Sequence, residues 1–183
     1  MRAALKCLAV LLALFALVAC ASVPVPAGLG LKLAPAALGA TISVQQHLRL
    51  ERGPRSDELD AVLEADETHL ELVGLALGQR VLTLHYEAGQ LQSWRHPMLP
   101  SQVQPAAVLE DMQLTLWPAA AIQEALPPGW RIEEQGLQRT LFKGDTAVMR
   151  IDYSEPVRWS GTVVLNNLRY HYRLTIQSTP VTN

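Results

Sequence analysis

Stretches in which apolar and polar residues alternate constrain the fold of this chain more than any other feature of its sequence. The alternation starts after Thr41, and an apolar residue at every second position is typical of a strand with one buried face. Tyr172 and Ile176 lie on one face of the clearest stretch, and Arg173 lies on the other. We expect strands over residues 42–50, 59–65 (which also fit a helix), 70–74, 82–86, 91–94, from 130 onward, 138–142, 147–153, 157–165 and 168–176, with a tight turn at Asn166–Asn167.

The period of the apolar pattern changes in the middle of the chain. Leu109 and Met112 follow Pro105 with a spacing of three, which fits an amphipathic helix opened by a proline in its first turn. Pro118 ends or kinks this helix. A second short helix is expected over residues 119–126.

The order of these elements predicts a mainly β, α+β fold. Eight to eleven antiparallel strands are expected to form a curved sheet or incomplete β-barrel, with the two short helices as a lid. Because strands precede and follow the helices, the sheet is expected to close around an interior, and such an arrangement often encloses an apolar cavity. Residues 41–183 are therefore expected to form one domain.

The N-terminal segment has the pattern of a bacterial lipoprotein signal. Arg2 and Lys6 supply a basic start, and the apolar run that follows ends in Leu-Val-Ala-Cys at Cys20, which resembles a lipobox. The run is shorter than the roughly 20 apolar residues of a membrane-spanning helix. We expect residues 1–19 to be a signal peptide removed before Cys20. The alternative is an ordinary signal peptide that happens to contain a cysteine.

The lipobox implies a lipid anchor on Cys20, with a diacylglyceryl group on its sulfur and a third acyl chain, such as palmitate, on its amine. More than one acyl chain gives stable attachment to a bilayer. Ala21 follows the cysteine where enteric retention signals carry Asp, which implies the periplasmic face of the outer membrane. Residues 20–40, rich in Pro, Gly and Ala, are expected to be the lipidated N-terminus and a tether, and roughly 20 extended residues reach about 60 Å.

The charge and the cysteine content of the chain exclude nucleic-acid partners and stabilisation by disulfides. Loss of residues 1–19 removes Arg2 and Lys6, so the formal net charge changes from −2 to −4. No basis for nucleic-acid binding remains. Cys7 also leaves with the signal peptide, so the mature chain contains no disulfide and depends on a packed core. We expect a monomer.

Two local segments and the order of elements carry a family resemblance. Residues 74–79, Gly-Leu-Ala-Leu-Gly-Gln, precede the strand at 81–86, and Gly129–Trp130 opens a strand after the helices. Over roughly residues 41–178 the chain resembles the LolA/LolB superfamily of periplasmic lipoprotein carriers, and within it the bacterial lipoprotein family DUF3261. The resemblance implies an incomplete β-barrel whose hydrophobic cavity is lidded by helices and holds acyl chains.

The resemblance also implies contact residues. A Pro-Leu-Gly hairpin in LolB carries a protruding leucine that helps insert cargo into the bilayer, and Leu77 before Gly78 matches it, with Ala76 in place of the proline. Leu75 and Leu77 are thus candidate membrane or cargo contacts, and the alternative for Leu77 is a hairpin residue folded back on the sheet. The candidate cavity-lining residues are Trp94, Met112, Trp117, Trp130 and Trp159, with plain core packing as the alternative for the tryptophans.

The sequence offers no recognisable catalytic, metal or cofactor site. It lacks Gly-x-Ser-x-Gly, His-Glu-x-x-His and phosphate-loop motifs. Its five histidines have no metal-ligand spacing. Asp152 and Glu155 are better interpreted as solvated charges than as a catalytic pair. We therefore expect no catalysis and no cofactor.

The leading hypothesis is an outer-membrane lipoprotein that binds an acyl or polyene lipid, or lipidated cargo, and aids its transfer into the membrane. A sixteen-carbon chain moved out of water gains roughly 10 kcal/mol, so transfer needs only a better apolar site downstream. Family association suggests the aryl polyene pathway. The alternative is a membrane-tethered assembly factor with a filled interior that binds a protein, and a lipid-modifying enzyme without familiar motifs is a third hypothesis.

Overall fold

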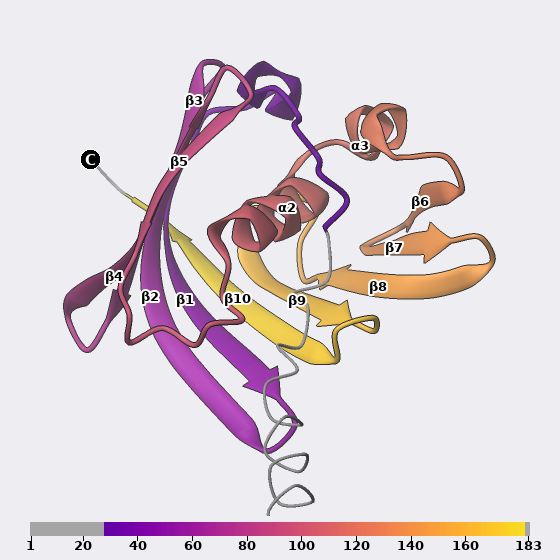
Figure 1. Cartoon of the computed structure of the whole chain (residues 1–183). Helices are drawn as coiled ribbons and strands as arrows, with labels where there is room; N and C mark the ends of the chain where they lie inside the picture. The colour runs from indigo at the N-terminus through magenta and orange to yellow at the C-terminus, as the bar shows by residue number, and fades with distance from the viewer. Residues whose placement is uncertain (1–27, 182–183) are drawn as a thin grey trace, which may run out of the picture.

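Ten antiparallel strands form one continuous curved sheet that does not close into a barrel (Figure 1). The structure, a computed structural model, describes residues 28–181. The strand order is β5-β4-β3-β2-β1-β10-β9-β8-β7-β6, so two five-stranded meanders meet where β1 pairs with β10. The strands are β1 (Ile42–Arg52), β2 (Arg55–Ala65), β3 (His69–Ala76), β4 (Gln79–Glu87), β5 (Gln90–Arg95), β6 (Trp130–Gln135), β7 (Gln138–Lys143), β8 (Thr146–Tyr153), β9 (Gly161–Asn167) and β10 (Tyr172–Pro180).

Two helices connect the meanders, and the first of them, α2 (Pro105–Leu116), lies against the concave face of the sheet (Figure 1). Pro105 begins this helix, where a missing N–H costs no hydrogen bond. Trp117 is extended and Pro118 follows it, so the helix ends there. The short α3 (Ala119–Ala125) then packs beside β6. Among residues 28–181 no helix has the length and apolar character needed to span a membrane.

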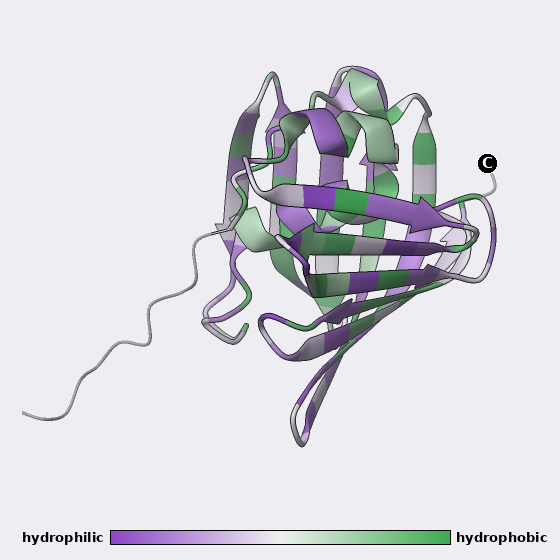
Figure 2. Ribbon diagram, turned by 90° about the vertical axis from the view of Figure 1, so that its right-hand side faces the viewer, coloured by the Kyte–Doolittle hydropathy of each residue, from purple (hydrophilic) through white to green (hydrophobic). Residues whose placement is uncertain are grey.

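The hydrophobic core fills the space between the concave face of the sheet and α2. Alternate residues of each strand face it, which produces the banded colouring along the strands in Figure 2. Leu63, Leu72 and Leu84 pair across β2, β3 and β4 and are almost completely buried. Residues 59–65 are therefore strand and not helix, because this register places every second residue in the core.

The predicted fold class is confirmed, with ten strands and both helices. The strand expected over residues 157–165 begins only at Gly161, because residues 157–160 belong to the loop before it. The predicted turn at Asn166–Asn167 is wrong, because both residues belong to β9 and Asn167 pairs with Tyr172. The side-chain oxygen of Asn167 accepts the backbone N–H of Tyr170 at 2.9 Å, which closes a longer turn. His171 adopts a positive φ in that turn, so β10 begins at Tyr172 and not at Leu168.

Residues 28–40, which we expected to belong to a free tether, instead pack against the domain. Residues 28–34, which we call the strap, run extended over the interior, and η1 (Pro35–Leu38) follows at the far end of the sheet (Figure 1). Leu31, Leu33 and Leu38 are each at most 6% exposed. The tether prediction is therefore wrong for these residues, since their apolar side chains complete the core. The signal peptide and Cys20 lie outside the described residues.

Candidate functional site

The interior between α2 and the sheet is the candidate site, because it gathers the largest apolar side chains. Leu109, Leu114 and Leu116 of α2 are buried, and Met112 is partly buried against the same core. Inward residues of the strands form the opposite wall, among them Leu165 with no exposed surface. This wall and the helix enclose a packed apolar core.

The strap fills the remaining part of this interior. Leu31 and Leu33 point into the core, while Lys32 between them is exposed. The strap is held by the side chains of α2 and the residue after it: Gln113 Nε2 donates to the Leu33 carbonyl at 3.2 Å and Trp117 Nε1 to the Ala34 carbonyl at 3.0 Å. The strap is thus attached by the buried Leu31 and Leu33, the partly buried Leu29 and a few hydrogen bonds, which is much weaker than the attachment of a strand paired along its length.

The structure separates the candidate lining residues into two groups. Trp117 has no exposed surface, and Met112, Trp130 and Trp159 are partly buried against the core. Trp94, in contrast, is 44% exposed and shares the outer face of the sheet with Thr83, its partner on β4. Trp94 therefore does not line the interior, because alternate residues of β5 face outward and Trp94 is one of them.

The β3–β4 hairpin projects an apolar side chain into solvent. Leu77 is 96% exposed and has φ 51°, and Gly78 after it has φ 74°. Two consecutive positive φ angles define the hairpin turn that normally carries Asn-Gly, and a leucine in this conformation is strained. Leu77 thus does not fold back on the sheet. Leu75 precedes it, half-buried, and pairs with Arg80.

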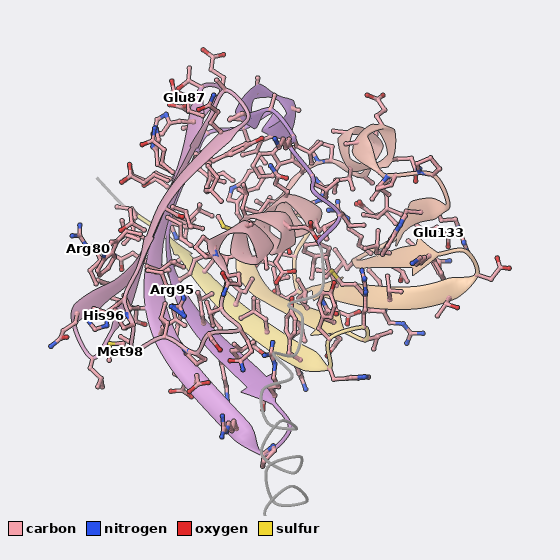
Figure 3. The ribbon with its side chains drawn as sticks, viewed as in Figure 1. Arg80, Glu87, Arg95, His96, Met98 and Glu133 are labelled. Atoms are coloured by element: carbon pink, nitrogen blue, oxygen red, sulfur yellow. The ribbon has the colours of Figure 1, made fainter. Side chains whose placement is uncertain are left out.

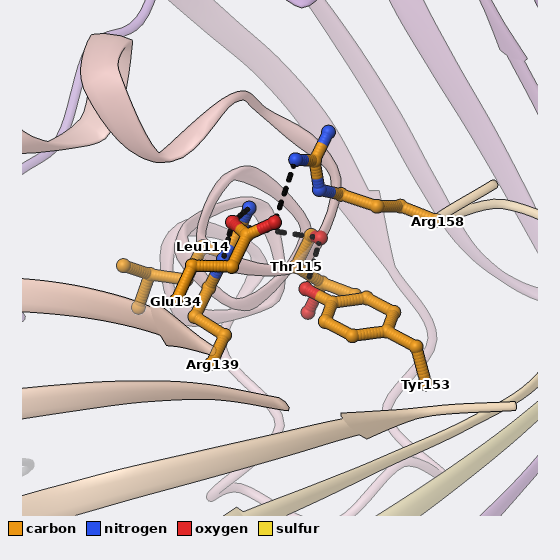
Figure 4. Close-up of polar contacts among 6 residues, drawn as sticks. All are labelled: Leu114, Thr115, Glu134, Arg139, Tyr153 and Arg158. Carbon is orange, nitrogen blue, oxygen red and sulfur yellow. Dashed lines mark hydrogen bonds and ion pairs between the residues drawn. The ribbon is translucent and has the colours of Figure 1, made fainter. Parts of the chain in front are cut away.

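A buried arginine holds the C-terminal end of α2 (Figure 4). Arg139 on β7 is 1% exposed, and its Nη1 donates to the carbonyls of Leu114 at 2.6 Å and Thr115 at 3.3 Å. Its Nη2 forms an ion pair with Glu134 Oε2 at 2.7 Å. The last carbonyls of a helix lack intrahelical donors and carry partial negative charge, so this cation satisfies them and fixes where the helix ends.

The groups around Arg139 complete this network. Tyr153 donates its hydroxyl to the Thr115 carbonyl at 2.7 Å, and burial raises the pKa of that tyrosine to about 12. Burial alone would raise the pKa of Glu134, but hydrogen bonds from Arg139 and Arg158 outweigh it and hold this pKa below its ordinary value. The carboxylate of Glu134 therefore stays ionised and keeps both arginines in place.

A second polar cluster connects the middle of α2 to the β9–β10 turn. Tyr172 donates its hydroxyl to Asp111 Oδ2 at 2.5 Å, and Asn167 donates its amide to the Tyr172 oxygen at 3.1 Å. Burial raises the pKa of Asp111 to about 7, although the Tyr172 hydrogen bond opposes this. Burial also raises the pKa of the neighbouring Glu110, which accepts the backbone N–H of Gly30 at 3.0 Å. Asp111 thus gains its proton near neutral pH, and burial shifts the pKa of Glu110 in the same direction.

Replacing Asp111 by Asn is expected to remove part of the pH dependence of stability. In the folded chain Asp111 keeps its proton up to about pH 7, whereas in the unfolded chain it loses the proton near pH 4, so its contribution weakens folding as the pH rises from about 4 to 7. Asn retains an acceptor for Tyr172 without this penalty. Urea unfolding should show a gain of up to about 4 kcal/mol at pH 8, from three pKa units of about 1.4 kcal/mol each, and little change at pH 4. An equal effect at both pH values would contradict this interpretation.

Two hollows of the described surface lie away from this interior and are lined mostly by polar side chains. One, of about 370 Å³, lies on the outer face over β1, β2 and β10, where His47, Arg49 and Glu58 line it. The other, of about 430 Å³, lies beside the β9–β10 turn. Within residues 28–181 no group of three or more His, Cys, Asp or Glu side chains is placed to hold a metal ion.

Comparison with known proteins decides the family of this chain. The model of the family described as protein of unknown function, DUF3261, matches residues 43–180, which is most of the chain. The chain belongs to the DUF3261 family. No curated protein matches this DUF3261 chain. Among solved structures, the crystal structure of a LolA superfamily protein from Nitrosomonas europaea is similar to it, with 8% sequence identity, a TM-score of 0.47, and coverage of 86% of this chain and 95% of that one.

Sequence reasoning missed the strap and the buried arginine. The alternation of Leu29, Leu31 and Leu33 was a usable signal for the strap, since it has the period of a strand. Arg139 stands two residues before Leu141 on the same strand of this DUF3261 chain, so the two side chains face the same side. The inward direction of Arg139 could therefore also have been predicted from the sequence. The carbonyls that it binds could not, because they come from a helix 24 and 25 residues earlier.

Proposed function

We propose that this DUF3261 protein is an outer-membrane lipoprotein, anchored through Cys20 and facing the periplasm, that binds an acyl lipid or the acyl chains of a lipidated cargo. The lipid occupies the space between α2 and the concave face of the sheet and passes on to a more apolar site in the membrane. A polyene lipid of the aryl polyene type fits the same chemistry. No catalytic step is involved, because apolar burial supplies the driving force.

The observation that carries this proposal is the strap. The interior is closed by a short segment whose apolar contribution is Leu31, Leu33 and the partly buried Leu29, and this segment is held by side-chain hydrogen bonds and not by a sheet ladder. An acyl chain offers the same interior a comparable apolar surface. The edge strands β5 and β6 are unpaired along their outer sides, so the sheet also has room to adjust around a guest.

A fatty-acid titration tests whether the strap and the lipid compete. Leu33→Ala weakens the strap, so the apparent affinity for a fluorescent fatty acid should rise by about tenfold, because a larger fraction of the protein is open to the ligand. Leu165→Ala is the matched control, since it removes the same leucine side chain from the sheet wall. It should lower stability without tightening binding. The proposal would be refuted if both variants were folded and neither bound the fatty acid saturably.

We expect Leu77 to lower the stability of the fold and to contact the membrane. Leu77→Asn should raise the free energy of unfolding by about 1 kcal/mol, because Asn accepts a positive φ, and should abolish lipid delivery to vesicles. Ala88→Asn is a matched control, since Ala88-Gly89 forms the same turn with φ 49° and 75° in the β4–β5 hairpin. It should stabilise equally and leave delivery intact. Unchanged delivery by Leu77→Asn would remove Leu77 from the transfer step.

A second candidate function is supported by the filled state of the interior. Trp117, Leu114 and Ile122 pack there with at most 1% exposure, so the protein has a complete core without any ligand. A membrane-tethered assembly factor with this core would bind a protein along one of its free edge strands. Failure of the chain to take up fatty acid would favour this function.

A further inference from the structure

The two ends of the sheet carry opposite charge. The turns β1–β2, β3–β4, β7–β8 and β9–β10 lie at one end, which we call the basic end, and the turns β2–β3, β4–β5, β6–β7 and β8–β9 lie at the other. Leaving histidine aside, the turns of the basic end, each taken with its two flanking strand-end residues, carry Arg52, Arg55, Lys143 and Arg169 against a single acid, Asp145. The turns of the other end carry Asp66, Glu67, Glu87 and Glu155 against a single base, Arg158.

Apart from the electrostatic interaction of Arg169 with Glu110, the cations of the basic end have no carboxylate partner among the described residues, and all of them except Arg55 lie over aromatic rings. Arg52, Arg55, Arg80, Lys143 and Arg169 form no ion pair there, in contrast to Arg139 and Arg158. The distances from cation to ring centroid are 5.4 Å for Arg52 to Tyr172, 5.3 Å for Arg80 to Trp94, 5.6 Å for Lys143 to Trp130, and 5.8 and 4.9 Å for Arg169 to Trp130 and Tyr170. Arginine and lysine beside tryptophan and tyrosine are the side chains that favour a membrane–water boundary.

Exposed apolar side chains accompany these cations. Leu77 is 96% exposed, Met98 50% and Leu168 42%, and all three lie in the turn or loop segments of the basic end. Figure 3 shows Arg80, His96 and Met98 gathered on one side of the molecule, with Glu87 at the opposite end of the same hairpin. The basic end thus combines unpaired positive charge with apolar tips.

The described chain also begins on the side of the basic end. Gly28 and Gly30 lie against Glu110, which interacts electrostatically with Arg169, and the strap then runs away from the β1–β2 turn towards η1 (Figure 1). Cys20 precedes Gly28 by only eight residues, and eight extended residues reach at most about 28 Å. A lipid on Cys20 therefore holds this side of the domain near the bilayer.

We infer that the basic end is a docking surface for a bilayer that contains anionic lipid headgroups. The inference deepens the proposed function, since the anchor on Cys20 is part of it. Phosphate groups of the bilayer neutralise Arg55, Arg80, Lys143 and Arg169, and Leu77 enters the apolar layer beneath them. The opposite, acidic end then faces the periplasm, and the long strands stand away from the membrane.

Vesicle binding tests this surface. A chain of residues 21–183 contains every described residue, including the whole core, and its fold is checked by circular dichroism. It should bind vesicles with roughly one-third phosphatidylglycerol but not vesicles of phosphatidylcholine alone, and added salt should weaken the binding. The triple variant Arg55→Ser/Arg80→Ser/Lys143→Ser should lose about 100-fold in affinity, or about fivefold for each cation.

The control separates the basic end from overall charge. Arg150→Ser removes an exposed cation without an ion pair from the middle of β8, so its vesicle affinity should stay within about twofold of the starting chain. Equal binding to both vesicle types, or an equal loss per cation in Arg150→Ser, would overturn the inference. Absence of vesicle binding with self-association in sedimentation would assign the surface to a second copy of the chain instead. Fatty-acid uptake by the triple variant reports on the proposed function independently, because the interior is unchanged.

Discussion

Replacing Arg139 by Met should lower the free energy of unfolding by about 3 kcal/mol. Met keeps most of the side-chain volume of Arg139, so the loss of unfolding free energy measures the polar contacts of the guanidinium. Without the guanidinium, the carbonyls of Leu114 and Thr115 lose their donor in a buried place, and Glu134 loses its closest cation. Urea unfolding followed by circular dichroism measures the change.

Two further variants isolate the role of Arg139 at the end of the helix. Arg158→Met removes the other cation on Glu134, but Arg158 is 26% exposed and donates to no α2 carbonyl, so it should cost less than about 1 kcal/mol. Arg139→Lys keeps the positive charge but not the planar guanidinium. Its loss of unfolding free energy should lie between those of Arg139→Met and Arg158→Met. Equal losses for Arg139→Met and Arg158→Met would show that the ion pair with Glu134 matters and that the helix contact does not.

Replacing Trp117 by Ala should lower the free energy of unfolding by about 4 kcal/mol. The ring has no exposed surface, and it joins three parts of the fold: the end of α2, the core and the strap. Trp117→Phe keeps an aromatic ring but leaves the Ala34 carbonyl without its indole donor, so it should cost about 1 to 2 kcal/mol. Thermal or urea unfolding distinguishes the two variants.

Trp94→Ala is the control for a tryptophan outside the core. Its ring is 44% exposed and contacts Arg80 and His96 on the outer face, so its loss should cost less than about 1 kcal/mol. Trp117→Phe also tests the strap, because it should tighten fatty-acid binding slightly by removing one of the bonds that hold residue 34. A loss from Trp94→Ala as large as that from Trp117→Ala would contradict the placement of these residues.

Local patterns were enough to predict the fold class, because several strands of this chain alternate between buried and more exposed residues. Period-two alternation in Ile42–Arg52 and the proline limits of Pro105–Leu116 are properties of neighbouring residues. The turn at Asn166–Asn167 was predicted wrongly for the same reason. Asparagine tolerates turn geometry, but here the pairing of Asn167 with Tyr172 across the sheet decides its conformation.

The candidate site was predicted only in part, because it depends on contacts between distant segments. Gln113 and Trp117 bind strap carbonyls 80 and 83 residues away, and no local pattern indicates those partners. Proline and glycine around the strap favour a linker interpretation, which its leucines overturn only once a groove is present to receive them. Trp94 shows the converse, since its aromatic character suggested the interior while its register on β5 places it outside.

The correction of the tether changes how the proposed anchor would place the protein on a membrane. A free segment of 20 residues would leave the domain unoriented, whereas the seven residues between Cys20 and Gly28 would restrict which side approaches the bilayer. The proposed anchor, the Leu77 tip and the cations near Arg169 then act on the same side. A lipid leaving the interior would have only a short path to the membrane.

Native mass spectrometry of the full chain, isolated from the bacterial envelope, tests the central claim most directly. The account predicts a species whose mass exceeds that of the protein by an acyl or polyene lipid, lost on addition of excess fatty acid and restored on removing it. The proposed anchor on Cys20 would be distinguished from a bound lipid, because a covalent lipid remains after denaturation. A protein that carries no displaceable lipid and takes up none when fatty acid is added would contradict the account.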